Sequence, residues 1–154
     1  MKFLIVAMGQ RLPAWAEAAC QDYLGRFGDW QVEMRALSAQ AREGKPVAAV
    51  MQAEAKRLNA AIGTQCRRVI LDERGKSYTS AALAARVQAW REDGRDVALV
   101  IGGADGLDPD FKANADEALR LSDMTLPHAL ARVILVEQLY RAWSLLNNHP
   151  YHRA

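Results

Sequence analysis

The chain has 154 residues, of which 51% are hydrophobic and 25% charged, and its formal net charge is +2. This composition is typical of one globular domain and excludes a disordered tail, a collagen-like fibre and a disulfide-stapled miniprotein. No run approaches the roughly 18 uncharged apolar residues of a membrane span. Residues 1–8 contain a lone lysine and no cleavage site follows, so we expect a first strand rather than a signal peptide.

Short aliphatic runs alternate with longer amphipathic segments along the whole chain. The pattern predicts strands over residues 2–8, 31–37, 67–72 and 97–101, with a short strand or turn over 121–126. It predicts helices over 13–27, 47–62, 80–91, 108–119 and 128–146. We therefore expect a single α/β domain over 1–154, with a mainly parallel sheet and helices on both faces.

Ligands of such sheets bind where the strands end, so the loops after Leu71, Ile101 and Leu126 are candidate sites. The loop after Ile101 contains Gly102, Gly103 and Gly106, which let the backbone approach a ligand closely. A tight strand-to-helix turn would explain the same glycines. The GxGxxG fingerprint of a dinucleotide site and the P-loop motif are both absent.

Charge is distributed unevenly along the chain. Residues 41–76 carry eight basic and four acidic side chains, whereas residues 77–127 carry five basic and nine acidic. Such an asymmetry is compatible with a polyanion bound on one face, although a solvated surface of mixed charge also explains it.

The tail, residues 147–154, carries two imidazoles, a phenol and a guanidinium within five positions (His149, Tyr151, His152, Arg153). These groups stack on bases, bind phosphates or exchange protons near neutral pH, so we favour a functional tail over one docked only for stability.

A metal site is not expected, because Pro150 interrupts helical spacing between the histidines and no ligand cluster completes a site. A serine hydrolase is not expected either, since no GxSxG elbow occurs. Cys20 and Cys66 are expected to be reduced thiols of a cytoplasmic protein, and a single disulfide between them stays an alternative.

Residues 128–143 (HALARVILVEQLYRAW) and 148–152 (NHPYH) resemble the C-terminal signature of the RlmH family. These are bacterial methyltransferases of the SPOUT superfamily that modify N3 of a pseudouridine in large-subunit ribosomal RNA. The blocks Ile101–Leu107 and Leu121–His128 are similar to that family's other motifs. The opening segment, Val6 to Gly9 with Pro13 and Trp15, is similar as well.

The resemblance implies a trefoil knot near the C-terminus whose loops hold S-adenosylmethionine. By position, the cofactor would contact residues of the strand-exit loops: Leu71, Gly102, Gly103, Leu121, Ser122, Asp123, Met124, Thr125 and Leu126. The resemblance also implies a homodimer, which suits the apolar helix 128–146, and a reaction that needs no metal. Ribosomal RNA, within the assembled ribosome, would be the partner. Candidates for substrate positioning or proton transfer are Tyr151, His152, Arg153 and Arg141.

Three alternatives remain open from the residues alone. The first is a SPOUT methyltransferase that acts on another nucleotide, and the C-terminal signature argues against it. The second is an NAD-dependent dehydrogenase, which would need GxGxxG after its first strand, where Gly9-Gln10-Arg11 stands instead. The third is a non-catalytic RNA-binding module, which would lack affinity for S-adenosylmethionine.

Overall fold

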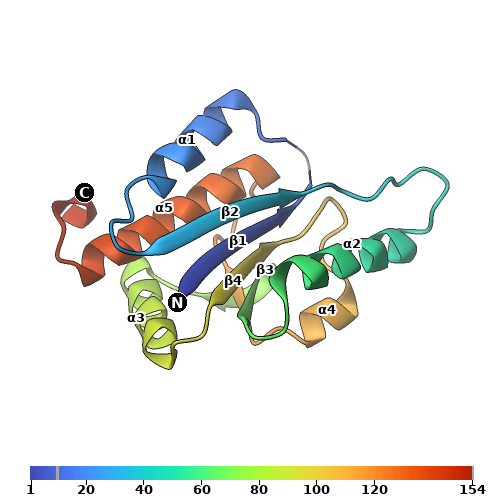
Figure 1. Ribbon diagram of the computed structural model, residues 1–154. Coiled ribbons are helices and arrows are strands. Elements are labelled where there is room, and N and C mark those ends of the chain that lie inside the picture. The colour runs from blue at the N-terminus through green and yellow to red at the C-terminus, as the bar shows by residue number, and fades with distance from the viewer. Residues whose placement is uncertain (10, 154) are drawn as a thin grey trace.

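The computed structural model describes residues 1–9 and 11–153, in which five parallel strands form one sheet (Figure 1). The strands are β1 (Lys2–Met8), β2 (Gln31–Leu37), β3 (Arg67–Ser77), β4 (Val97–Ile101) and β5 (Glu117–Arg120). Their order across the sheet is β2-β1-β4-β3-β5, and every neighbouring pair runs parallel. The predicted α/β class and parallel sheet are confirmed, and the trefoil knot stays a prediction.

Strand β1 lies inside the sheet and is buried on both faces. Phe3, Ile5 and Ala7 belong to one hydrophobic cluster, while the alternate residues of the strand belong to the other. Because successive side chains point to opposite faces, an unbroken apolar run is what a strand between two helical layers requires.

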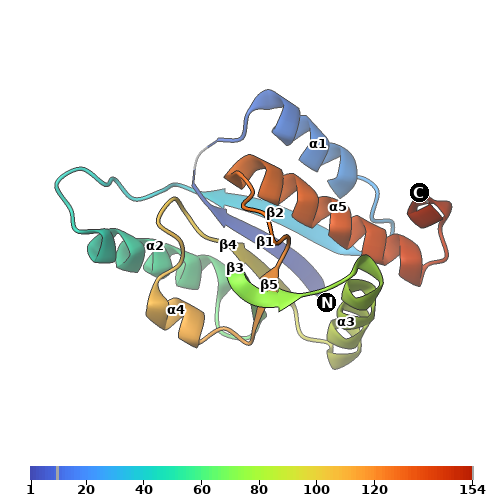
Figure 2. The same ribbon diagram turned by 180° about the vertical axis from the view of Figure 1, so that it is seen from behind.

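Helices cover both faces of the sheet, as Figures 1 and 2 show. They are α1 (Ala14–Leu24), α2 (Val47–Ile62), α3 (Ser80–Asp93), α4 (Pro109–Ala113) and α5 (His128–Leu146), followed by a 3-10 turn over Pro150–Arg153. Helices α2 and α4 pack on one face, and α1, α3 and α5 pack on the other. Parallel pairing brings the carboxyl ends of all the strands to one edge of the sheet, where strand order reverses around β1 and β4.

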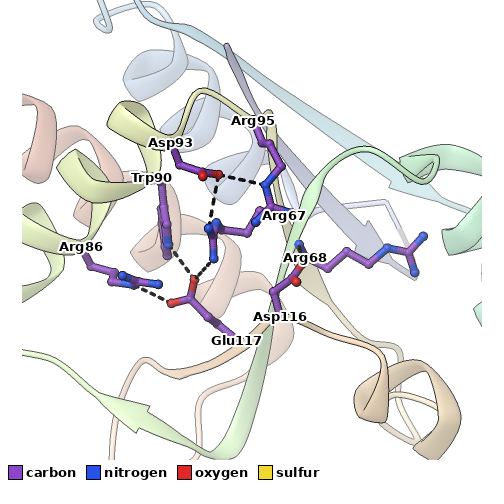
Figure 3. A network of polar contacts seen from close by, with 8 residues as sticks. All are labelled: Arg67, Arg68, Arg86, Trp90, Asp93, Arg95, Asp116 and Glu117. Atoms are coloured by element: carbon purple, nitrogen blue, oxygen red, sulfur yellow. Dashed lines mark hydrogen bonds and ion pairs between the residues drawn. The ribbon is translucent and has the colours of Figure 1, made fainter.

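The predicted helix over 108–119 was wrong beyond its first turns. Helix α4 ends at Ala113, and Glu117–Arg120 form strand β5 instead. Figure 3 shows the contacts that hold this strand: Glu117 accepts hydrogen bonds from Arg67, Arg86 and the Trp90 indole. The backbone N–H of Arg68 donates to Asp116 at 2.7 Å. Pairing with β3 thus overrides the helical propensity of this alanine-rich segment.

Three smaller differences also have physical causes. Helix α1 ends at Leu24 rather than residue 27, so Gly25 follows the helix and does not weaken its interior. Trp15 is 55% exposed, because α1 turns Ala16 and Cys20 toward the core. Strand β3 continues to Ser77 after a bulge between Leu71 and Lys76, where Gly75 packs directly on the backbone of Leu119.

Two further expectations concern membrane spans and the state of the two cysteines. Among the described residues, no helix is both long and apolar enough to cross a membrane. Cys20 and Cys66 are free thiols and belong to separate hydrophobic clusters, so no disulfide joins them.

Candidate functional site

A cavity of about 1040 Å³ opens at the carboxyl edge of the sheet. Its wall is formed by the loops that follow β1, β2, β4 and β5, the bulge of β3 and the first turn of α5. This is the position at which open parallel sheets bind ligands, and the volume is at the upper end of the range for small-molecule sites.

The structure brings most of the predicted cofactor residues together in this cavity. Leu71, Gly103 and all six residues from Leu121 to Leu126 line it. The segment 121–126 is not a strand, as one alternative predicted, but is itself the loop that leaves β5. Gly102 does not line the cavity directly. A Cβ at Gly102 would lie 2.9 Å from Leu107, so this glycine lets the loop close.

Gly103 is held against a buried carboxylate that no sequence motif singled out. A Cβ at Gly103 would lie 2.9 Å from Oε1 of Glu54, a residue of α2 that is 5% exposed. The other oxygen of Glu54 accepts the backbone N–H of Gln40 at 3.1 Å. Glu54 therefore binds the β2–α2 loop and lies close against the glycine loop at Gly103. In the sequence, the only pattern that pointed to a buried Glu54 is its place among the inward-facing residues of helix 47–62.

The β2–α2 loop, residues 38–46, carries basic groups to the rim of the cavity. Arg57 of α2 holds the start of this loop in place by donating hydrogen bonds to the carbonyl of Ser38 and to the side chain of Gln40. Arg42 lines the cavity and forms an ion pair with Asp105 of the glycine loop at 2.8 Å. The start of the loop is therefore held by hydrogen bonds, and the loop places the Arg42 guanidinium beside the cavity.

Two basic side chains of α5, His128 and Arg132, lie within its first two turns. Arg132 does not line the cavity and is 1% exposed, and burial lowers its pKa. His128 lines the cavity, and its Nε2 is buried without a hydrogen-bond partner among the described residues. Burial, and secondarily the Arg132 charge, lowers the pKa of His128, with the backbone of Gly102 and Met8 acting in the opposite direction. His128 is therefore neutral at neutral pH.

The tail residues lie away from this cavity. Tyr151 packs on the ring of Tyr140, with ring centroids 4.7 Å apart, and His152 Nδ1 lies 2.9 Å from the Ser144 hydroxyl. From His128 to Ser144, α5 rises about 24 Å along its axis. In Figure 1 the C-terminus accordingly lies at the edge of the sheet where the strands begin. The Arg153 side chain lies outside the described residues.

Within the described part of the chain, no group of three or more histidine, cysteine, aspartate or glutamate side chains is arranged to hold a metal ion. The cavity is instead lined by glycine, alanine and larger apolar residues, together with three arginines and four acidic residues. Such a wall suits an organic ligand that is recognised by main-chain hydrogen bonds.

The depressed pKa of His128 predicts a specific pH dependence. The folded protein binds the proton of His128 less tightly than the unfolded chain, whose imidazole titrates near 6.5. Stability should therefore fall as the pH drops below about 6.5. We expect an NMR titration midpoint for His128 below 6.5, and a stability loss that is smaller in His128→Gln. A midpoint at or above 6.5 would contradict this assignment.

Comparisons with known proteins identify the family of this chain and proteins that share its fold. The family model described as "Predicted SPOUT methyltransferase" matches residues 1–152. The protein named "Ribosomal RNA large subunit methyltransferase H" from Methylibium petroleiphilum is 61% identical, and the match covers 99% of each chain. Its namesake from Leptothrix cholodnii is 57% identical over the same shares. A solved structure of a probable methylase family protein from Haemophilus influenzae shares the fold, with a TM-score of 0.56 at 16% identity over 97% of this chain and 69% of that chain. The chain therefore belongs to the SPOUT methyltransferase family.

Proposed function

We propose that this chain is an S-adenosylmethionine-dependent enzyme of the cytoplasm that methylates N3 of a pseudouridine in large-subunit ribosomal RNA. The substrate we expect is the assembled ribosome. The observation that carries the proposal is the likeness, over 99% of both chains, to proteins named for large-subunit ribosomal RNA methylation. The cavity at the carboxyl edge of the sheet supplies a matching small-molecule site.

The residues of the cavity suit S-adenosylmethionine. Gly103 presents bare backbone, the loop Leu121–Leu126 presents further main-chain groups, and Leu71 supplies an apolar wall. These are groups that can recognise an adenine ring through hydrogen bonds while covering its faces. When bound, the cofactor supplies a methyl group on a positively charged sulfur. A neutral His128 at the wall avoids the repulsion that an imidazolium would exert on that charge.

The braced loop 38–46 is our candidate for contact with RNA phosphates. Arg42 and Lys45 are exposed on this loop, and exposed Arg11 also lines the cavity. Guanidinium groups bind phosphate with two parallel hydrogen bonds. The ion pair of Arg42 with Asp105 is largely solvent-exposed on the arginine side. Such pairs are weak, so a phosphate can replace the carboxylate.

We propose further that the tail of one protomer completes the cavity of its partner in a homodimer. In one chain the tail and the cavity lie at opposite ends of α5, so they cannot meet unless the tail leaves its docking site. Two copies that pack with their α5 helices antiparallel bring each tail to the other's cavity. Exposed apolar side chains at the cavity end of α1 and α5, Trp15 and Leu130, support an interface there.

The reaction requires that N3–H lose its proton while N3 attacks the methyl group. The enzyme must align the two and stabilise negative charge on the ring oxygens. Tyr151 is suited to positioning the ring as a neutral phenol, because burial and its hydrogen bonds with Tyr23 and Glu137 raise its pKa. It is therefore a positioning group rather than the base. Arg141, His152 and Arg153 are the remaining candidates for binding the ring or its phosphate.

Cofactor binding separates this proposal from its alternatives. We expect S-adenosylmethionine, but not NAD, to raise the Tm of the protein, because a ligand that binds only the folded state stabilises it. Gly103→Ala should weaken binding about tenfold, since its Cβ lies 2.9 Å from buried Glu54 and displaces the cavity wall. Gly25→Ala is the matched control, with only ordinary contacts at 3.6 Å and a position outside the cavity. A Tm raised by NAD alone would favour a dehydrogenase, and RNA binding without any cofactor response would favour a binding module.

Mixed dimers test whether the tail acts in the partner's site. Tyr151→Ala/His152→Ala should abolish turnover while leaving cofactor affinity intact. Gly103→Ala should leave its own cavity nearly empty when the cofactor concentration is held well below the Kd of this variant. Dimers that combine one chain of each variant retain one complete site if the tail acts across the interface. Statistical mixing then restores about a quarter of wild-type methyl transfer, since half the dimers are mixed and each has one intact site. If the tail acts within its own chain, mixing restores nothing, and that result would overturn the composite site.

A further inference from the structure

Glu137, at the middle of α5, joins this helix to the tail through side-chain hydrogen bonds. Its Oε1 accepts the Tyr151 hydroxyl at 2.9 Å and two nitrogens of Arg141 at 3.0 and 2.6 Å. Its Oε2 accepts the side-chain amide of Gln138 at 2.7 Å. One carboxylate thus holds two of the four residues that we propose act on the substrate.

The same network ties the tail to the helices around it. Tyr151 gives its only hydroxyl hydrogen to Glu137, so the 3.0 Å contact between the Tyr23 and Tyr151 hydroxyls must be donated by Tyr23 of α1. Gln138 in turn accepts the Ser80 hydroxyl of α3 at 2.6 Å. Glu137 is therefore the junction at which α1, α3 and the tail meet α5.

The network fixes direction as well as distance. The Arg141 guanidinium lies over the Tyr151 ring, 5.1 Å from its centroid, while both groups bind the same carboxylate oxygen. A shared acceptor and a cation–π contact leave these two side chains little freedom to rotate independently. The Glu137 side chain is only 17% exposed, so water competes weakly for these donors.

We infer that Glu137 is a positioning residue for methyl transfer, orienting the Tyr151 hydroxyl and the Arg141 guanidinium before substrate binds. The inference rests on the proposed function, because it gives the tail a catalytic role. Glu137 itself does not line the cavity, and it lies about 2.5 helical turns beyond His128 along α5. Its effect is therefore expected on kcat rather than on cofactor affinity.

The protein offers a closely matched control in Glu117. This carboxylate is also 17% exposed, and it binds two arginines and one aromatic donor (Arg67, Arg86 and Trp90; Figure 3). Glu137 binds one arginine, one aromatic donor and one amide. Glu117 differs in location, because its partners belong to β3 and α3 rather than to the tail. Removing its charge disturbs folding stability in the same way without touching Tyr151 or Arg141.

The test compares Glu137→Gln, Glu117→Gln and Tyr151→Phe in steady-state methyl transfer to ribosomes, with cofactor Kd and Tm measured for each. We expect Glu137→Gln to lower kcat about 10- to 100-fold, since misorientation of positioned groups carries penalties of that size. Its cofactor Kd should stay within twofold of the wild-type value. Glu117→Gln should lower Tm comparably and leave kcat within twofold of the wild-type value.

The double variant separates positioning from structural damage. If Glu137 acts through the Tyr151 hydroxyl, Glu137→Gln/Tyr151→Phe should be little worse than the slower single variant, because both remove one coupled interaction. Fully additive losses, or equal kcat losses in Glu137→Gln and Glu117→Gln, would overturn the inference. Normal turnover in Tyr151→Ala would instead refute the tail's role in the proposed function. Loss in Tyr151→Ala with normal turnover in Glu137→Gln would refute the positioning inference alone.

Discussion

The length and rigidity of α5 constrain everything else in this molecule. Its first turn closes the cavity with His128, and its last turns hold the tail through Tyr140 and Ser144. A helix of 19 residues cannot bring its two ends together, so the cavity and the tail of one chain stay apart. The homodimer that we propose, with antiparallel α5 helices, reconciles this separation with a single active site.

The cavity itself follows from parallel pairing. Every strand ends at the same edge, so loops far apart in sequence meet there without long connections. Glu54 and Arg57 then fix the β2–α2 loop, and Gly103 packs against Glu54. The site is therefore prearranged by buried contacts of α2, while its outer rim carries exposed arginines suited to a polyanionic substrate.

Sequence patterns predicted the elements whose signals are local. The apolar runs of β1 and β4 and the helix after Pro127 were correct because burial and periodicity fix them. Strand β5 was missed because residues 114–120 favour a helix locally, and only pairing with β3 and the arginine contacts of Glu117 make them a strand. Burial of Arg132 could not be predicted either, since charged residues at helical spacing usually mark a solvated face.

For the candidate site too, local sequence patterns predicted one part, while contacts between distant elements determine the other. Glycines and strand ends located the cavity, and eight of the nine predicted cofactor residues line it, Gly102 being the exception. The roles of Glu54 and Glu137 depend on contacts between elements distant in sequence, so no local pattern shows them. The family resemblance supplied the proposed cofactor and substrate, which side-chain periodicity does not encode.

Methyl transfer to ribosomes that lack the modification tests the central claim most directly. The protein would be incubated with labelled S-adenosylmethionine and these ribosomes, and the labelled nucleotide would be located by mass spectrometry. Our account predicts label on N3 of a single pseudouridine in large-subunit ribosomal RNA. Label on another nucleotide, or no transfer by protein that binds the cofactor, would contradict it.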